Sequence, residues 1–500
     1  MRAASLFTLM AATVSTLVTA APPAPGAAVC ADLAKAFPAT SGNDAVLTSS
    51  DGQPYTAAQT AGFNPLNNKL APACIVQPTS QAQVATVMKS IYRHQANYAV
   101  RSGGHTGMAG WDSVQNGVLI DMSKLTDFSF NVKPGTIFVE PGLRWGDIYK
   151  RAAEYGVAPM GGRVQHVGTG LVLGGGLSLL SPQYGYACDG LVSAEIVMVD
   201  GSTRRVTAET DPQLFRAIKG GGGRFGIVTR YELKAYPTGT NDDKNWYGGS
   251  ITALTPEGMD LMVQYTEKFV AATDDPKATL LTNVGMLKQN GAPLYLGSGF
   301  LFYKGTQDDF NAAFKDFLSI PGIIAQTQPM SYLEATAVTP LGWAPTQAYK
   351  WLGGSLYPNS SPNGWQATWD NVKAFLHRNE AVLESAFFSL TPVKTNQIEQ
   401  GYQNGGNAIA PPRGKSYVHW LFSNILAPGT TAFPQALEND RMAFLQQNPS
   451  SPGLPLFLNE VDATQKTFQS YGWFPQLLKQ YYKADPTAFS MRKQQGPTFW

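Results

Sequence analysis

The distribution of apolar and polar positions predicts alternating strands and helices in the first half of the chain. Short apolar runs at residues 74–78 and 98–101 are typical of buried strands, and residues 80–95 between them carry apolar side chains at helical spacing. Together they predict a strand–helix–strand unit. Alternation of apolar and polar side chains predicts another strand over residues 191–199, which a hairpin turn at residues 200–201 ends.

After a polar, turn-rich stretch at residues 237–245, the pattern changes. Longer amphipathic segments now alternate with strand-like runs, which is typical of an α+β domain with an antiparallel sheet. The expected helices span residues 256–272, 307–318, 365–378 and 433–447, and the expected strands span residues 278–286, 294–302 and 417–422.

Composition narrows the class of protein. Of 500 residues, 43% are apolar and 14% are charged, which excludes an extended disordered chain and leaves room for two domains. A formal net charge of +2 gives no reason to expect nucleic acid or a membrane surface as partner. Arg2 precedes an apolar run that ends in small residues near Ala20, so residues 1–20 are predicted to be a signal peptide and the protein to be secreted. The sequon at Asn359 fits that expectation.

The chain has three cysteines, an odd number for a secreted protein. Cys188 lies in an apolar stretch and is predicted to be a buried free thiol. A bridge between Cys30 and Cys74 is then the natural pairing.

Candidate chemistry begins where the strand at residues 98–101 ends. Gly103 and Gly104 allow a tight turn whose backbone N–H groups can bind an anion, and His105 follows directly. Three more glycine clusters occur at residues 168–170, 174–176 and 220–223. No Gly-x-Gly-x-x-Gly turn opens a helix after the first strand, so these clusters predict a large phosphate-bearing ligand held by several loops.

The sequence Arg-Ser-Gly-Gly-His at residues 101–105 resembles the flavin-attachment motif of the berberine-bridge-enzyme-like oxidases, in the vanillyl-alcohol-oxidase superfamily of PCMH-type FAD-binding proteins. The resemblance continues through residues 118–123, 139–142, 167–176, 184–189, 225–229 and 482–486. It implies an α+β fold with a two-lobed PCMH-type FAD-binding domain and an α/β substrate domain that has an antiparallel sheet. Residues 21–238 and 454–500 would form the FAD-binding domain, and residues 239–453 the substrate-binding domain.

By the same resemblance, His105 would be joined covalently to the 8α-methyl carbon of FAD, and Cys30 and Cys74 match the N-terminal disulfide of the family. The other residues expected to surround the cofactor are Arg101, Ser102, Gly103, Gly104, Thr106, Gly107, Met108, Gly168, Thr169, Gly170, Leu171, Gly175, Gly176, Ser178, Asp189, Val192, Gly226, Val228 and Asn459. Many members attach the flavin a second time through a cysteine. Here Val164 stands in that position, so one link through His105 is expected.

A second departure from the family pattern concerns the catalytic base, the residue that accepts the proton of the substrate hydroxyl. Members that oxidise alcohols and carbohydrates use a tyrosine two residues before the asparagine, whereas this chain has Phe457, which cannot accept a proton. A base is then expected from residues 415–420, as Tyr417 or His419, or from His166 near the flavin loops. Because side chains alternate along a strand, either Tyr417 and His419 or Ser416, Val418 and Trp420 face the flavin.

We therefore expect a monomeric, secreted FAD-dependent oxidase that acts on a small aromatic or secondary-metabolite substrate. Hydride would pass to flavin N5, and O2 would be reduced to hydrogen peroxide. Two alternatives are an oxidative cyclase of secondary metabolism and a flavin-carrying binding protein without turnover. The histidines lack metal-ligand spacing, so no metal site is expected. Glu460 and Asp462 are expected on one face of a short strand, but nothing identifies glycosidase geometry.

Overall fold

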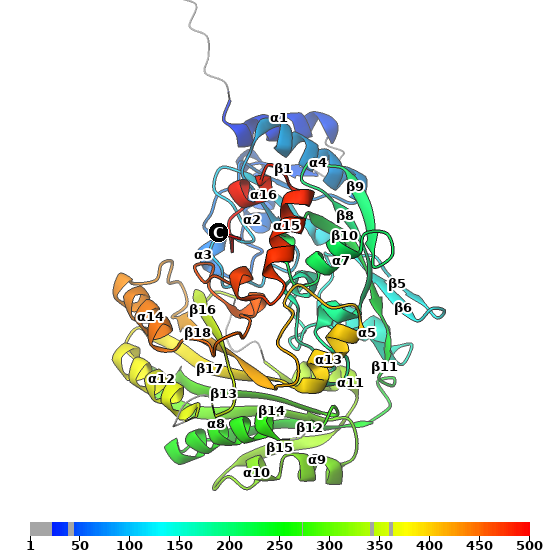
Figure 1. Cartoon of the computed structure of the whole chain (residues 1–500). Helices are drawn as coiled ribbons and strands as arrows, with labels where there is room; N and C mark the ends of the chain where they lie inside the picture. Colours follow the sequence, from blue (N-terminus) through cyan, green and yellow to red (C-terminus); the bar gives the residue numbers. More distant parts are fainter. Residues whose placement is uncertain (1–22, 39–44, 273, 341–344, 360–363) are drawn as a thin grey trace, which may run out of the picture.

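The computed structural model describes residues 23–38, 45–272, 274–340, 345–359 and 364–500. The expected signal peptide lies outside the described residues, as do the last two positions of the sequon at Asn359. Within the described part, the fold class expected from the sequence is confirmed: sheets of four, five and two strands and a large antiparallel sheet, with helices around them (Figure 1).

The first small sheet contains the predicted strand–helix–strand unit. Its order is β1-β2-β4-β3, formed by Val46–Leu47, Cys74–Val76, Val118–Asp121 and Tyr98–Arg101. Helix α4 (Gln81–His94) joins β2 to β3, and the side chain of Ser80 accepts a hydrogen bond from the Gln83 N–H at its first turn. Strand β4 lies between β2 and β3, parallel to both. Strand β3 therefore delivers the chain to the glycine turn at one edge of this sheet.

The predicted disulfide is present. Cys30 of α1 (Pro25–Ala36) is bonded to Cys74 of β2, and Cys188 is a buried free thiol. The bridge fixes α1 against α4 and the first sheet, where apolar side chains of all three elements form one core.

The second small sheet is antiparallel, with the order β5-β6-β10-β8-β9. Its strands are Phe128–Asn131, Thr136–Val139, Ile227–Lys234, Leu191–Val197 and Thr203–Thr207. The hairpin predicted at residues 200–201 joins β8 to β9. Strand β10 begins directly after the last glycine cluster, so this sheet holds a second set of glycine loops in place.

The large sheet has seven antiparallel strands in the order β15-β12-β14-β13-β17-β18-β16. They are Ile324–Met330, Trp246–Ala253, Ala292–Tyr303, Ala278–Gln289, Leu383–Val393, Tyr417–Leu426 and Tyr349–Leu356. Helices α8 (Pro256–Ala271), α12 (Gln366–Asn379) and α14 (Gln435–Gln447) occur close to where the sequence predicts them. The single helix expected over residues 307–318 is instead two, α9 (Gln307–Ala313) and α10 (Lys315–Leu318), because the backbone at Phe314 leaves the helical region.

The two faces of this sheet have different neighbours. One face packs on α8, α9, α10 and α12 through a core that includes Met262, Val284, Phe388 and Phe422. The other face is turned toward the two small sheets (Figure 1). Successive side chains of a strand point to opposite faces of the sheet. The same strands therefore contribute alternate side chains to the core beneath the helices and to the face that looks toward the small sheets.

The remaining described helices and short strands are α2 (Gln53–Gln59), α3 (Pro65–Asn68), α5 (Trp145–Ala153), β7 (Val157–Ala158), α6 (Ser181–Tyr184), α7 (Pro212–Ile218), β11 (Tyr236–Pro237), α11 (Tyr332–Val338), α13 (Thr395–Gln403), α15 (Phe474–Ala484) and α16 (Phe489–Lys493). The chain end lies against the first part of the molecule. The buried guanidinium of Arg224 donates hydrogen bonds to the carbonyl oxygens of Ser490, Gln494, Gln495 and Pro497.

Candidate functional site

A cavity of about 650 Å³ lies between the glycine loops and the seven-stranded sheet. Glycines supply much of the wall on the side of the small sheets: Gly103, Gly104, Gly168, Gly170, Gly174, Gly222, Gly223 and Gly226. They come from the turn after β3, from the stretch between β7 and α6, and from the segment between α7 and β10. The sequence pattern singled out each of their clusters separately. The fold thus brings all four glycine clusters to one cavity.

Two of these loops touch through backbone alone. A Cβ atom on Gly103 would lie 2.6 Å from the backbone nitrogen of Gly168, so only glycine fits there. Arg144 Nη1 donates to the Gly103 carbonyl oxygen at 2.9 Å and also to the carbonyl oxygen of His166, which holds the pair together. At Gly223 a Cβ would meet nothing within 4 Å, so the wall is open toward the cavity at that point.

This wall fits FAD. Flat ring systems and diphosphates need close approach to backbone N–H groups, which the glycine loops provide. Lysine is absent from the described residues that line the cavity, and the single arginine there, Arg163, is paired with Glu460. Backbone groups rather than basic side chains are therefore available to the phosphates.

His105 lies in this wall with its ring parallel to that of Phe63, at 4.3 Å between ring centroids. Burial, together with the nearby His166 and Arg144, lowers the pKa of His105 to about 3. The imidazole is therefore neutral at physiological pH, which is the nucleophilic form. His166 lies 6.0 Å away between ring centroids, and burial also lowers its pKa.

The structure places the expected cofactor residues in two groups. The first group lines the cavity: Ser102, Gly103, Gly104, His105, Thr106, Gly168, Gly170, Leu171, Gly226, Val228 and Asn459. The second group is not in the cavity wall: Arg101, Gly107, Met108, Thr169, Gly175, Gly176, Ser178, Asp189, Val192 and the candidate base His166.

Several members of the second group support the wall from behind. Arg101 is paired with Asp121 at 3.1 Å and donates to the Ala58 carbonyl oxygen of α2. Asp189 is fully engaged by Lys219, Asn407 and the backbone N–H of Tyr186. In the described structure Arg101 thus joins β3 to β4 and α2, and Asp189 joins three segments that are distant in the sequence.

The candidate bases Tyr417 and His419 point toward the small sheets, so one of the two registers left open by the alternation is the observed one. Neither lines the cavity. Both are buried, and the His419 ring is stacked on Phe457 at 5.1 Å between centroids. Phe457 itself lines the cavity and separates them from it.

Hydrogen bonds fix the protonation of His419. The Ser355 hydroxyl donates to the Pro455 carbonyl oxygen at 2.6 Å, so its oxygen accepts from Nδ1–H of His419 at 2.8 Å. Nε2 is then an acceptor, and the Tyr186 hydroxyl donates to it at 2.9 Å. The Tyr417 hydroxyl donates in turn to the Tyr186 oxygen at 2.7 Å. Burial lowers the pKa of His419 to about 3, so the imidazole ring behind Phe457 is neutral. The hydrogen bonds fix which of its two nitrogens carries the proton.

The part of the cavity over the seven-stranded sheet is an apolar chamber with a polar floor. Thr252, Ser298, Asn283 and Ser389 are cross-strand partners on β12, β14, β13 and β17, so they form one row across the sheet. All four line the cavity and are partly exposed to it. No hydrogen bond of the described structure uses their side chains, and we call these four residues the polar row. Leu171, Leu177, Trp351, Leu421 and Phe457 provide apolar walls.

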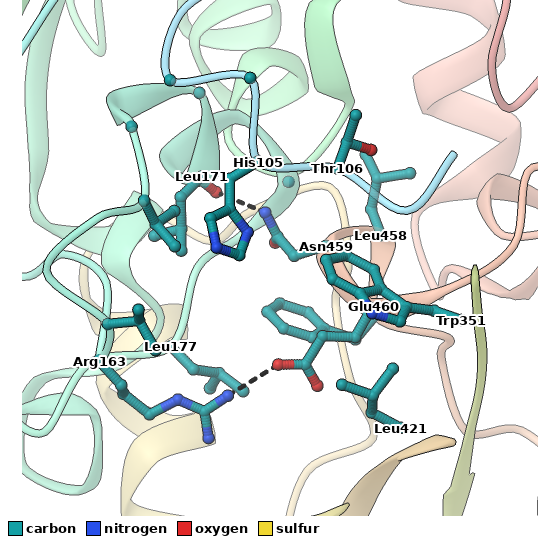
Figure 2. A pocket seen from close by; sticks show the side chains of 18 of the residues that line it. His105, Thr106, Arg163, Leu171, Leu177, Trp351, Leu421, Leu458, Asn459 and Glu460 are labelled. Carbon is teal, nitrogen blue, oxygen red and sulfur yellow. Dashed lines mark hydrogen bonds and ion pairs between the residues drawn. The ribbon is translucent and has the colours of Figure 1, made fainter. Parts of the chain in front are cut away.

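An ion pair crosses this chamber (Figure 2). Arg163 Nη2 lies 2.7 Å from Glu460 Oε1, and Nη1 donates to the Thr391 hydroxyl at 2.7 Å. Glu460 follows Asn459, whose amide binds the Leu171 carbonyl oxygen and the Gly176 N–H. The short strand expected here is instead a 3-10 turn, Leu458–Glu460. It directs the Glu460 carboxylate into the cavity.

Sequence reasoning missed other residues of the site. Phe63 stacks on His105 from the N-terminal arm, where no pattern marked it. Asp112 lines the cavity, and burial raises its pKa to about 6. The sequence pattern assigns no role to Arg163, although an arginine directly after the Gly161–Gly162 pair is a signal that could mark it.

Three further features bear on the chemistry. Val164 lines the cavity, whereas Cys188 is buried outside its wall. Among the described residues, no group of three or more His, Cys, Asp or Glu side chains could hold a metal ion. No helix among these described residues has both the length and the apolar character needed to span a bilayer.

Comparison with known proteins agrees with this geometry. A family model described as an FAD binding domain matches residues 72–207. The FAD-dependent monooxygenase drtC of Aspergillus calidoustus is 27% identical over 81% of this chain and 78% of its own length. The bifunctional solanapyrone synthase of Alternaria solani is 27% identical over 91% of this chain and 86% of its own length.

Solved structures show the same fold. Berberine bridge enzyme from Eschscholzia californica superposes with a TM-score of 0.73 at 17% identity, over 94% of this chain and 99% of that one. The 6-hydroxy-D-nicotine oxidase of Arthrobacter nicotinovorans gives a TM-score of 0.71 at 21% identity, over 89% and 95%. The chain thus carries an FAD binding domain within the fold of berberine bridge enzyme, and it is an FAD-linked oxidoreductase.

Proposed function

We propose that this protein is a secreted oxidase whose single FAD is bound covalently through His105. Its substrate would be a small oxygenated ring compound of the aromatic or secondary-metabolite class. Bound FAD would supply the hydride acceptor, and O2 would reoxidise it with release of hydrogen peroxide. The observation that carries the proposal is the cavity itself, in which one wall is made of glycine loops with His105 and the other wall is the polar row.

The single attachment is supported by the positions of the cysteines. Cys30 and Cys74 are bonded to each other, and Cys188 is outside the cavity wall. Burial and the neighbouring Asp189 hold the pKa of the Cys188 thiol well above its usual value, so the reactive thiolate is disfavoured. His105 is then the nucleophile available at the cavity.

The substrate class follows from the chamber. Apolar walls bind a ring system, and the polar row offers hydroxyl and amide groups that a ligand's oxygens can satisfy. Among the described residues that line the cavity, Arg163 and Glu460 form an ion pair whose charges compensate each other, so a neutral substrate suits the chamber better than an ionic one.

The test is anaerobic reduction of the purified holoenzyme by a panel of phenols, benzylic alcohols, sugars and cyclic amines. We expect loss of the oxidised flavin absorbance with a phenolic or benzylic compound, and stoichiometric hydrogen peroxide when air is admitted. A flavin that every panel member leaves oxidised contradicts the oxidase.

A second candidate is an oxidative cyclase, in which the oxidised product reacts further in the same chamber. The similarity to a bifunctional solanapyrone synthase favours it. Product analysis distinguishes the two, because a cyclase returns a product with a new ring. A flavin-carrying binding protein remains the outcome if ligands perturb the flavin spectrum without reducing it.

Secretion is supported by the disulfide between Cys30 and Cys74, since such bonds persist in oxidising compartments. Asn359 is exposed, as a glycosylated asparagine requires. The N-terminal sequence of protein recovered from culture medium would test cleavage near Ala20. Its mass after denaturation would test glycosylation, and its native mass in solution would test the expected monomer.

A further inference from the structure

We propose that Glu460 is the catalytic base of this protein, accepting the proton of a substrate hydroxyl while Arg163 and Thr391 hold its carboxylate in place. This inference rests on the proposed function, because it assigns the proton of the same oxidation.

The first argument is position. Among the described residues that line the cavity, the carboxylates are Asp112 and Glu460. Asp112 lies beside the loop of His105, where a Cβ on Gly104 would be 3.2 Å from its Oδ2. Glu460 instead lies among Leu421, Trp351 and Leu177 in the chamber over the seven-stranded sheet (Figure 2). It is the carboxylate that a substrate in the chamber would meet.

The second argument is the free oxygen. Oε1 of Glu460 is occupied by Arg163 Nη2 at 2.7 Å, whereas no hydrogen bond of the described structure engages Oε2. The Glu460 side chain is 15% exposed, and that exposure is to the cavity. A carboxylate held by one oxygen can accept a hydrogen bond from a ligand with the other.

The third argument is basicity. Burial raises the pKa of Glu460 above its usual value, although the ion pair with Arg163 opposes the shift. A general base works best when its pKa is close to the working pH, so this shift improves Glu460 as an acceptor. The other charged groups nearby are Asp462 and Arg441, which pair with each other at 3.5 Å, while His419 behind Phe457 is neutral.

The fourth argument is the absence of a competitor in the chamber. Phe457 has no proton-accepting atom, and Tyr417, His419 and His166 are not in the cavity wall. The step balances with bound FAD as the hydride acceptor and Glu460 as the proton acceptor. The substrate's C–H bond would break with its electron pair leaving as hydride, its O–H proton would go to Glu460 Oε2, and the C–O bond would become a carbonyl.

Arg163 is a positioning residue in this scheme. Arg163 lies in the loop after β7, directly before Val164. Thr391 is on β17, and Glu460 is near the chain end. The guanidinium therefore joins three distant segments and fixes the carboxylate at the point where they meet. Release of the proton after the reaction restores the ion pair.

The test uses the holoenzyme and two variants, Glu460→Gln and Glu399→Gln. The second is a matched control, because Glu399 also pairs with an arginine, Arg413, but lies outside the cavity. With a substrate from the panel, we expect Glu460→Gln to slow anaerobic flavin reduction by about 10²–10⁴-fold and to remove its pH dependence, while the control matches wild type. Equal rates for Glu460→Gln and wild type overturn the assignment and leave the oxidase proposal intact.

A binding measurement makes the inference independent of turnover. Phenol and anisole differ by a methyl group on the oxygen, so only phenol can donate to Glu460. From flavin absorbance changes, wild type should prefer phenol by about tenfold or more, and the preference should vanish on acidification and fall in Glu460→Gln. Equal affinity for the two probes, or binding of neither, overturns the inference even if no panel compound reduces the flavin.

If Glu460→Gln retains no FAD, Glu460→Asp takes its place. It keeps the carboxylate but draws it back by one methylene, so we expect a slower reaction with the pH dependence preserved. A pH-independent Glu460→Asp enzyme with the wild-type rate overturns the proposal.

Discussion

The ring of Phe63 lies parallel to the imidazole of His105, with 4.3 Å between their centroids and 21° between their planes. This contact removes one face of the imidazole from water. With the nearby Arg144 and His166, it explains why the histidine is held neutral.

The neutral imidazole leads to a prediction for cofactor attachment. The pKa of His105 is lowered to about 3, so lowering the pH from about 8 to 5 does not protonate the nucleophile. Apoprotein mixed with FAD should form the covalent adduct at the same rate across that range, measured as flavin fluorescence that survives acid precipitation. A rate that falls with a midpoint near 6.5, the ordinary imidazole value, would show that the ring is solvated.

A second prediction concerns the number of links. Intact mass should show one FAD on wild type, and His105→Ala should release its FAD on denaturation. Cys188→Ser should keep the full adduct, because this thiol is buried outside the cavity wall. Loss of a linkage in Cys188→Ser would contradict the single attachment.

The polar row predicts a change in substrate affinity without loss of stability. The side chains of Asn283 and Ser389 make no hydrogen bond in the described structure, so Asn283→Leu or Ser389→Ala should raise KM by about 2–10-fold and change the melting temperature little. Thr282, on the opposite face of β13, bonds Thr266 at 2.7 Å in the core. The control Thr282→Val should therefore lower the melting temperature and leave KM unchanged; the reverse pattern would rule out the assignment of the two faces.

Asp112 predicts a pH-dependent stability. Burial raises its folded pKa to about 6 from an unfolded value near 3.8, so the folded state binds the proton more tightly. The contribution of the Asp112 carboxyl to the free energy of unfolding is therefore largest below about pH 3.8. It declines as the pH rises to about 6 and does not change at higher pH. Asp112→Asn removes the buried charge and keeps the acceptor for Asn67. Its melting temperature should exceed that of wild type at pH 7 by more than at pH 4; an equal difference at both would refute the shift.

Much of the cofactor side of the site could be predicted from the sequence, because the turns that form it are determined by residues adjacent in the chain. Gly103, Gly104 and His105 follow strand β3, and the cluster at residues 220–223 follows helix α7, so both lie at the ends of elements with clear periodicity. Turn chemistry of this kind depends on neighbours in the chain, so the pattern shows it directly.

The substrate side depends on strand pairing, which the pattern does not contain. Alternation along β18 showed that Tyr417 and His419 share a face, but it could not show that Phe457, from the chain end, covers them. Arg163 and Glu460 are separated by 297 positions, so nothing local connects them. The sequence pattern predicts Glu460 on a short strand, whereas the structure has a 3-10 turn there.

The two-faced sheet also bears on how this chain could acquire new substrates. Its strands place Asn283 and Thr282 side by side in sequence but on opposite sides, one in the chamber and one in the core. Point substitutions in the polar row can therefore vary ligand chemistry while the packing against α8 and α12 stays as it is. A one-residue insertion in β13 would instead exchange the two sets of side chains along the rest of that strand. Divergence within such a sheet is expected to proceed by substitution, with changes of length confined to its loops.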